Sequence, residues 1–266
     1  METSYKTVLI TGASSGIGAH AARYLASAGM HTILTARRKE NLRAVVREIK
    51  SAGGSADFYS ADLSDEAQRL ALFERIQIHH PIVDVLINNA GFGWYGFFHL
   101  MPWETAQNLL AVNIDAVAHL TSLFLPDMLT RGSGHIINIG SIAGSLPNQG
   151  IAMYSASKSF LDAFTTSLHR ELRGSGVHAS VICLGAIETE FYLRAREQKN
   201  GLPIPGERMT ASVERVNRAI WRLLKRPRRV MYLPGYLRLA PPLFRLFAPV
   251  IDLVGPILLR RSDRKK

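Results

Sequence analysis

Residues 11–18 read Thr11-Gly12-Ala13-Ser14-Ser15-Gly16-Ile17-Gly18, a glycine-rich turn between two segments of opposite character. The apolar run Val8-Leu9-Ile10 precedes the turn, and the alanine-rich segment 17–28 follows it. A strand, a glycine-rich turn and a helix in this order direct free backbone N–H groups and the positive helix end at one place, which favours a pyrophosphate there. The glycine spacing differs from G-x-G-x-x-G, so a purely structural turn remains an alternative at this point.

The same alternation of strand-like and helix-like patterns continues along the chain. We expect strands at 8–10, 31–36, 56–61, 83–87, 135–139, 177–184 and 229–233, and helices at 17–28, 39–51, 65–79, 102–129, 152–173 and 212–224. Strands that alternate with helices of this length indicate βαβ units. The predicted fold class is therefore α/β, a single doubly wound parallel sheet of the Rossmann type with helices on both faces.

Charge divides the chain into a body and a tail. The whole chain has 266 residues and a net charge of +11, but residues 222–266 contain 12 Lys and Arg against only Asp252 and Asp263. With no repeat and no low-complexity linker before residue 222, we expect one dinucleotide-binding domain at 1–235 and a basic, apolar C-terminal extension at 236–266. The single cysteine, Cys183, excludes an internal disulfide framework, and we expect no secretory signal.

The residues after the second expected strand indicate which dinucleotide the site prefers. A dinucleotide site that selects NAD usually has an acidic residue there, whereas arginine favours the 2′-phosphate of NADP. Here the segment is Ala36-Arg37-Arg38-Lys39, with no acid before Glu40. Guanidinium groups offer forked, charge-assisted hydrogen bonds to a phosphate, and cations at a helix start oppose the helix dipole. A basic, solvated helix start is the alternative, but the pattern favours NADP(H).

Tyr154 and Lys158 are four residues apart, on one face of an expected helix. An unperturbed tyrosine has a pKa of about 10, and a nearby ammonium group favours the phenolate, which suits acid–base chemistry. Such a pair alone is common on helix surfaces, so its meaning depends on the other motifs.

Taken together, these motifs resemble the short-chain dehydrogenase/reductase family over roughly residues 5–190. Residues 11–18 match its cofactor turn, Asp62-Leu63 its adenine contact, and Asn88-Asn89-Ala90-Gly91 its N-N-A-G segment. Asn113, Ser141, Tyr154 and Lys158 match its catalytic tetrad, and residues 184–189 align with its P-G-x-x-x-T segment. Leu184 replaces the usual proline of that segment, which would loosen the loop over the nicotinamide.

The resemblance implies a role for each matched residue. Tyr154 would exchange a proton with the substrate oxygen, Ser141 would hydrogen-bond that oxygen, and Lys158 would bind the nicotinamide ribose. Asn113 would position a water that links Lys158 to solvent. The implied cofactor-binding residues are Gly12, Ser14, Ser15, Gly16, Ile17, Gly18, Arg37, Arg38, Asp62, Leu63, Asn89, Ala90, Gly91, Tyr154, Lys158, Ile187 and Thr189. Family members often form dimers or tetramers through the two long central helices, so we expect a homodimer or homotetramer.

Substrate contacts are expected from the segments 93–98, 145–149 and 190–209. We take Trp94, Tyr95, Gln149, Ser141 and Tyr154 as candidate substrate residues. The aromatic residues of the first segment favour an apolar alcohol/ketone pair, although its phenylalanines can equally be core residues. His99, His119, His169 and His178 have no metal-ligand spacing, so no metal site is expected.

The tail carries a seven-residue rhythm. Pro242, Pro249 and Pro256 recur with it, and so do Leu239, Leu246 and Leu253. The prolines predict short, kinked helical turns, and the longest charge-free stretch of the tail, 253–259, is too short to span a bilayer. An apolar stripe next to the basic cluster 260–266 suits peripheral contact with anionic lipid, and packing on the body or on a partner subunit is the alternative. Nucleic acid is not an expected partner, and the expected location is the cytoplasm, with possible contact at the cytoplasmic membrane face.

The sequence is compatible with three functions. The leading hypothesis is an NADP(H)-dependent oxidoreductase of a hydrophobic carbonyl and secondary alcohol, such as a steroid, retinoid or lipid-like compound. A reductase of a small soluble carbonyl, with the tail used for oligomerisation, keeps the same chemistry. A non-catalytic NADP(H)-binding scaffold or sensor is the third, and the complete tetrad argues against it.

Overall fold

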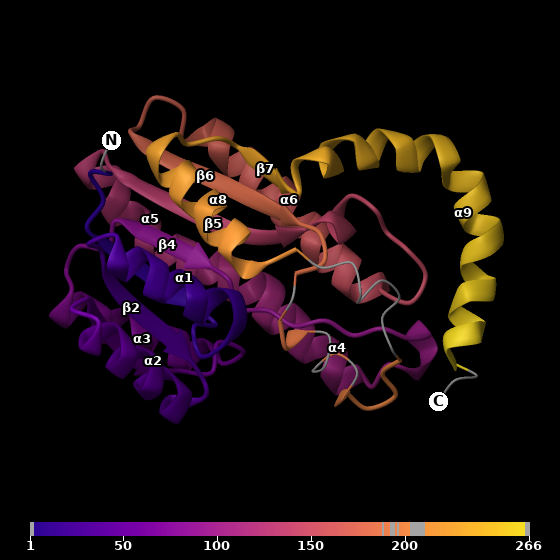
Figure 1. Ribbon diagram of the computed structural model, residues 1–266, viewed down its shortest axis with the longest axis horizontal. Coiled ribbons are helices and arrows are strands. Elements are labelled where there is room, and N and C mark those ends of the chain that lie inside the picture. The colour runs from indigo at the N-terminus through magenta and orange to yellow at the C-terminus, as the bar shows by residue number, and fades with distance from the viewer. Residues whose placement is uncertain (1–2, 188, 192–194, 196, 203–210, 264–266) are drawn as a thin grey trace.

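The computed structural model describes residues 3–187, 189–191, 195, 197–202 and 211–263. Within this part of the chain, seven parallel strands form one sheet in the order β3-β2-β1-β4-β5-β6-β7 (Figure 1). The strands are β1 (Thr7–Thr11), β2 (His31–Ala36), β3 (Ser55–Ser60), β4 (Val85–Asn88), β5 (Gly134–Ser141), β6 (Val177–Leu184) and β7 (Val230–Leu233). We call the side where these strands begin the amino edge and the side where they end the carboxyl edge.

Helices cover both faces of the sheet, as the alternation of patterns predicts. They are α1 (Gly16–Ser27), α2 (Lys39–Ser51), α3 (Glu66–His79), α4 (Trp103–Leu110), α5 (Ala116–Arg131), α6 (Ala152–Glu171), α8 (Val213–Lys225) and α9 (Ala240–Asp263). On one face, Val8 and Ile10 of β1 pack in a core with α1, α2 and α8. On the other face, Leu9 packs in a second core with α3, α5 and α6. The predicted doubly wound α/β class is confirmed.

The strand order reverses between β1 and β4, which is where this kind of sheet opens a crevice at its carboxyl edge. The turn after β1 and the ends of β4, β5 and β6 all meet there. The sequence motifs of residues 11–18, 88–91, 141 and 184–189 follow these strand ends, so one crevice collects them.

The helix expected at 102–129 is interrupted, which corrects the sequence prediction. Between α4 and α5 the backbone makes a π turn, Ala111–Asp115, that contains the buried Asn113. The Asn113 amide pairs with the backbone of Phe92, accepting from its N–H at 3.1 Å and donating to its carbonyl at 3.0 Å. Turns of this kind are frequent at functional positions in helices, and here the wide turn lets the side chain reach the loop after β4.

The run Trp103–Arg131 is also the part of the described chain that is long and apolar enough to cross a membrane, judged by length and composition alone. Core helices of other proteins meet the same criterion. Here Leu120, Phe124 and Met128 of α5 are buried in the second core, against the sheet.

The extension departs from the sequence prediction as well. A 3₁₀ turn, Gly235–Leu239, leads into α9, which is a continuous helix of 24 residues where short separate turns were expected. Figure 1 shows that α9 leaves the body and bends in an arc back toward the end of the molecule that holds α4. A bend of this kind accommodates prolines inside a helix. The boundary expected at 235/236 falls inside the 3₁₀ turn.

Candidate active site

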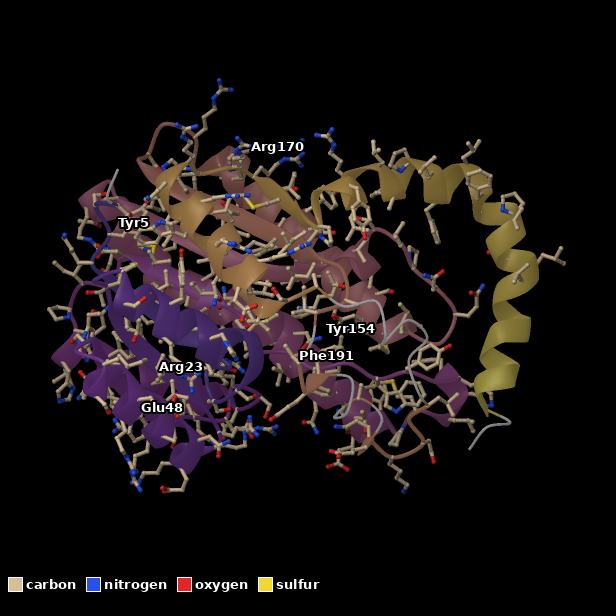
Figure 2. All side chains as sticks on the ribbon, viewed as in Figure 1. Tyr5, Arg23, Glu48, Tyr154, Arg170 and Phe191 are labelled. Carbon is tan, nitrogen blue, oxygen red and sulfur yellow. The ribbon has the colours of Figure 1, made fainter. Side chains whose placement is uncertain are left out.

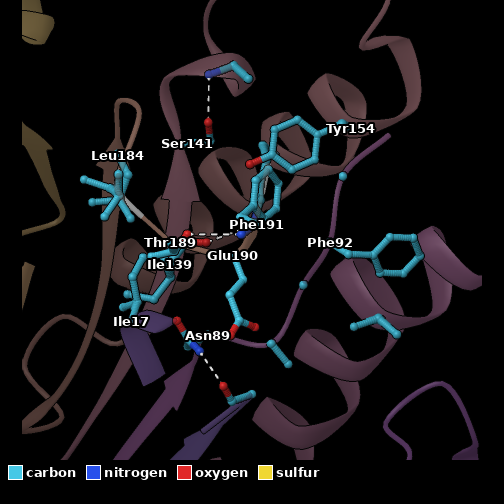
Figure 3. Close-up of a pocket in the computed structure, with 18 of the residues that line it drawn as sticks. Ile17, Asn89, Phe92, Ile139, Ser141, Tyr154, Leu184, Thr189, Glu190 and Phe191 are labelled. Carbon is cyan, nitrogen blue, oxygen red and sulfur yellow. Dashed lines mark hydrogen bonds between the residues drawn. The ribbon is translucent and has the colours of Figure 1, made fainter. Parts of the chain in front are cut away.

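The turn after β1 packs closely against the residues that follow β4. Gly12 has φ +66°, and a Cβ there would lie 2.8 Å from the Ala90 Cα. A Cβ on Gly18 would lie 2.6 Å from the Asn89 Nδ2, which itself donates to the Thr11 carbonyl at 2.8 Å (Figure 3). Only glycine fits these two positions, so the start of α1 is held with its N–H groups toward the crevice.

Arg38 lies beside this turn. Its guanidinium donates to the Ser14 Oγ at 3.0 Å and to the Ser15 Oγ at 2.7 Å. The Glu190 carboxylate lies 3.8 Å from the same guanidinium. Arg37 points the other way, is mostly exposed, and pairs with Asp62 at 3.7 Å. The two arginines therefore differ, because Arg38 is joined to the turn whereas Arg37 joins the end of β3.

Tyr154 and Lys158 lie in the first turns of α6, and the Lys158 Nζ is 5.8 Å from the centre of the Tyr154 ring. Lys158 is buried and donates from Nζ to the Ile139 carbonyl at 2.9 Å, a bond that fixes the ammonium below the end of β5. Burial lowers the pKa of Lys158 to about 8, and Asp162 and Cys183 oppose that shift. At neutral pH the group is therefore mainly charged, as phenolate stabilisation at Tyr154 requires.

Asp162 is a half-buried carboxylate that the sequence reasoning missed. It follows Lys158 by one helical turn, accepts from the Cys183 thiol at 3.5 Å and from the Ser145 hydroxyl at 3.4 Å. Burial raises the pKa of Asp162, while its hydrogen bonds and the Lys158 charge lower it. The spacing of four residues from a helical lysine was the available signal, because i and i+4 share one helix face.

Ser141 ends β5, and its Oγ accepts from the Ala143 N–H at 3.1 Å, which fixes the side chain at the mouth of the crevice (Figure 3). Asn113 lies behind the Gly91 backbone and donates to the Ser157 Oγ at 3.1 Å. Its amide thus ties the loop after β4 to α6. The water that the family resemblance assigns to Asn113 stays a prediction.

A single cleft of about 700 Å³ joins these groups. Most of the predicted residues line it: Gly12, Ser14, Ser15, Ile17, Arg37, Arg38, Asp62, Leu63, Asn89, Ala90, Gly91, Trp94, Ser141, Tyr154, Lys158, Ile187 and Thr189. Gly16, Gly18 and Asn113 do not line it but support residues that do. Residues predicted from separate sequence motifs therefore lie around one connected cleft.

Two of the predicted substrate residues are not in this cleft. Tyr95 is buried in a small cluster with Leu202, and its carbonyl accepts from the Leu202 N–H at 2.8 Å. Gln149 lines a separate cavity of about 220 Å³, with Trp94 on the shared wall. Both residues follow cleft residues in sequence, Trp94 and Asn148, but neither of them lines the main cleft.

The cleft has an apolar end. The sequence predicted that the segment 190–209 contributes substrate contacts, but not which residue makes them. Phe191 packs its ring 5.6 Å from that of Tyr154, at 50° (Figures 2 and 3). Leu146, Ile151 and Leu184 complete the apolar lining. Phe191 lies in the expected segment 190–209, of which residues 192–194, 196 and 203–210 lie outside the described residues, as do Glu188 and the basic residues 264–266 of the tail.

Comparison with known proteins gives consistent results. A model of the short chain dehydrogenase family matches residues 6–200. Over 182 residues the chain is 39% identical to the ketoacyl reductase HetN of Nostoc, a match that covers 68% of this chain but only 63% of HetN. This chain therefore spans somewhat less than two thirds of that relative.

Two solved structures overlay most of this chain. A short-chain dehydrogenase from Sphingobium yanoikuyae in complex with NADPH is 31% identical, with a TM-score of 0.80, over 94% of this chain and 95% of that one. One from Burkholderia phymatum in complex with NAD is 26% identical, with a TM-score of 0.82, over 95% and 96%.

Proposed function

This chain belongs to the short-chain dehydrogenase/reductase family, and we propose that it is an NADP(H)-dependent oxidoreductase that interconverts a hydrophobic carbonyl and its secondary alcohol. The single observation that carries the proposal is the layout of the cleft. Tyr154, Lys158 and Ser141 lie at an apolar end, and the cation Arg38 lies beside the glycine turn at the other.

The cleft residues suit a dinucleotide. Gly12 and Gly18 keep side chains out of the turn, so the backbone at the start of α1 is open to a pyrophosphate. Arg38 lies where a 2′-phosphate of the adenine ribose would meet it, on the side of β2. The relatives include a complex with NADPH and another with NAD. Arg38 supports the NADPH choice, because a guanidinium beside the glycine turn can form charge-assisted, forked hydrogen bonds with a 2′-phosphate.

The residues of this chain would do the following in a reduction. The Tyr154 hydroxyl would donate a proton to the carbonyl oxygen of the substrate, and a nicotinamide held in the cleft would supply the hydride. Ser141 hydrogen-bonds the same oxygen and orients it. The Lys158 ammonium, held by the Ile139 carbonyl, stabilises the phenolate that remains on Tyr154. In the direction of oxidation, the phenolate takes the proton back from the alcohol.

The apolar end of the cleft supports a hydrophobic substrate. Phe191 lies against the Tyr154 ring, and Trp94, Leu146 and Leu184 continue the apolar wall. Such a wall gains free energy with each apolar carbon that it removes from water, about 0.8 kcal/mol per methylene. A small polar carbonyl gains little from it, and the preference for long-chain or ring ketones follows.

The test is the oxidation of NADPH with a series of ketones of increasing apolar size. We expect kcat/KM to rise with apolar size, and Tyr154→Phe to lower it roughly 10²- to 10⁴-fold. Tyr24→Phe, which keeps the ring that packs on Trp221, is the matched control and should leave the rate unchanged. A rate independent of Tyr154 would refute the catalytic assignment. A preference for small soluble carbonyls would refute the substrate class, and cofactor binding without turnover of any ketone would favour a scaffold.

We further propose that α9 contacts an anionic membrane surface, which would give the enzyme access to lipid-like substrates. Large exposed apolar side chains follow one another along α9 and the end of the turn before it, at spacings of four and three residues: Leu239, Leu243, Leu246, Val250 and Leu253. Spacings of this kind form one stripe of a helix. The basic residues of the tail supply charge complementary to anionic lipid. A bent helix fits a fluid surface better than it fits a straight coiled-coil partner.

Sedimentation of the full chain with vesicles of phosphatidylglycerol and phosphatidylcholine tests this part. Binding should require the anionic lipid and be lost in the Leu246→Glu/Leu253→Glu variant. The control Ile78→Glu, an equally exposed apolar residue on α3, should bind like the parent. Light scattering on the same proteins decides the alternative. If the parent forms an oligomer that this double variant dissociates, and vesicles bind neither protein, α9 is a self-association segment instead.

A further inference from the structure

Three metal-ligating side chains converge near the amino edge of the sheet, and none of them lines the cleft. His31 begins β2, Asp57 is the third residue of β3, and His80 caps the C-terminus of α3. The Asp57 Oδ2 lies 3.5 Å from the His31 Nε2 and 3.6 Å from the His80 Nε2. The three ligand atoms all lie within 4.8 Å of one another.

The fold itself brings these residues together. In the parallel register, His31 pairs with Ser55 and Ile33 pairs with Asp57, so the side chains of His31 and Asp57 project from the same face. Ile33 lies in the core that contains Leu72 and Ile76 of α3, which identifies that face as the one α3 covers. Helix α3 ends at a point that brings His80 next to His31 and Asp57. The ring centres of His31 and His80 lie 4.8 Å apart, and the rings are stacked.

One buried atom of this cluster, the His31 Nε2, has no hydrogen-bond partner among the described residues. The His31 Nδ1 lies 2.7 Å from the Ser55 Oγ. A ring that donates from Nδ1 to an oxygen presents the lone pair of Nε2, which is how metal-binding histidines are usually oriented. In the tautomer that carries its proton on Nδ1, the Nε2 lone pair lies 3.5 Å from a carboxylate oxygen, and a cation bound by both atoms would satisfy them.

We propose that His31, Asp57 and His80 bind a Zn²⁺ ion. Bond lengths of about 2.0–2.1 Å to nitrogen and oxygen give a tetrahedral edge of about 3.3–3.4 Å, close to the two observed separations from Asp57. Two imidazoles and one carboxylate are a ligand set that zinc accepts, with water in the fourth position. The Asp57 side chain is 43% exposed, which leaves an open path for the ion and the water.

One neighbouring charge competes with the metal. The Lys50 Nζ lies 3.2 Å from the Asp57 Oδ1, the oxygen that does not face the histidines. Both this lysine and the carboxylate are about half exposed, so their ion pair is weak and leaves Oδ2 available. The ion would join β2, β3 and the end of α3, and it would stabilise the fold without taking part in the reaction at the carboxyl edge.

Cobalt binding to untagged protein, first freed of metal with EDTA, tests the proposal. Tetrahedral Co²⁺ absorbs visible light through d–d transitions, so one equivalent should produce bands that Zn²⁺ then abolishes. We expect His31→Gln, His80→Gln and Asp57→Asn each to weaken Zn²⁺ binding at least tenfold by calorimetry. His79→Gln is the matched control, since its Nδ1 contacts the Arg75 carbonyl and not the cluster, and it should bind like the parent.

Thermal unfolding separates a lost site from a lost fold. The melting temperature of the parent should rise with Zn²⁺ concentration, as expected for a ligand of the folded state, whereas that of folded His80→Gln should not. Binding that persists in all three ligand variants would overturn the proposal, because the metal would then lie elsewhere. The absence of both cobalt bands and zinc heat in the parent would overturn it as well. NADPH oxidation is expected to be the same with and without the metal, so this result is independent of the proposed function.

Discussion

The two edges of the sheet use the same strands for different purposes. At the carboxyl edge, Lys158 and Ser141 are joined to backbone groups and open into a large cleft. At the amino edge, His31, His135 and His178 stand at or near the starts of β2, β5 and β6. His135 is buried, and the other two are half-buried. Figure 2 separates the two, with Tyr154 and Phe191 at one end of the strands and Tyr5 at the other.

This difference has a physical reason. In a parallel sheet the loops that follow the strands converge on a crevice, so polar groups there can meet a ligand and water. The starts of the strands meet short connections and helix ends, where polar side chains contact one another and the protein and line no large cleft. Changes at the carboxyl edge should therefore alter activity with little change in stability, and changes at the amino edge should do the opposite.

Lys158→Met should produce the largest effect. We expect kcat/KM to fall roughly 10³-fold, because the phenolate of Tyr154 loses its ammonium neighbour. The free energy of unfolding should stay within about 1 kcal/mol of the parent, since an apolar group replaces a buried charge. Steady-state kinetics and denaturant unfolding measure the two quantities. A parallel loss of both would break the proposed separation between the edges.

Arg38→Ala should alter cofactor choice without altering the fold. A charge-assisted hydrogen bond to phosphate is worth about 1.5–3 kcal/mol, so the preference for NADPH over NADH should drop roughly 10- to 100-fold. Arg37→Ala is the matched comparison. Its exposed guanidinium contacts Asp62 instead of the glycine turn, and its effect should be several times smaller. Equal effects of the two substitutions would remove the special role of Arg38.

His135 gives the smallest effect and belongs to the amino edge. Burial lowers the pKa of His135 to about 3, helped by the nearby His178 and His169, so the ring stays neutral in the folded protein. Its Nε2 contacts the Ser180 hydroxyl, which donates to the Arg228 carbonyl, and this fixes the proton on Nε2. The unfolded chain takes up a proton near pH 6.5, so stability falls as pH drops below that value toward 3.

The contribution of His135 between pH 7 and pH 5.5 is about 1 kcal/mol of unfolding free energy. His135→Gln should reduce the loss of stability over this interval by that amount, while the rate at pH 7 changes little. Urea unfolding in EDTA at the two pH values measures it, with exposed His20→Gln as the control. An unchanged pH slope in His135→Gln would show that this ring does not titrate on unfolding.

The sequence was most informative at the carboxyl edge. The glycine turn, the arginines after β2 and the Tyr154–Lys158 pair lie in short linear motifs. Each is weak alone, and their joint resemblance to one family predicted the residues of the cleft. The side-chain directions of Tyr95 and Gln149 depend on how their loops turn, which linear spacing does not encode. The same holds for Phe191, whose position against Tyr154 depends on the path of the chain after β6.

The histidine cluster could not be predicted from spacing at all. His31, Asp57 and His80 come from three separate elements, and only the register of β2 with β3 and the length of α3 unite them. Asn113 is an intermediate case. Its identity was predicted from the family motif, but the π turn around it was not, because a hydrogen-bonded amide outweighed the regular helix pattern.

That π turn sets the rotational phase of everything after it. Each residue advances a helix by about 100°, so the wide turn changes which side chains α5 presents relative to α4. Phe124 and Leu120 point at the sheet because of that rotation. Asn113 is therefore an exception among the residues of the carboxyl edge. Its two hydrogen bonds with Phe92 hold the turn that sets the orientation of α5, so it serves the fold as well as the cleft.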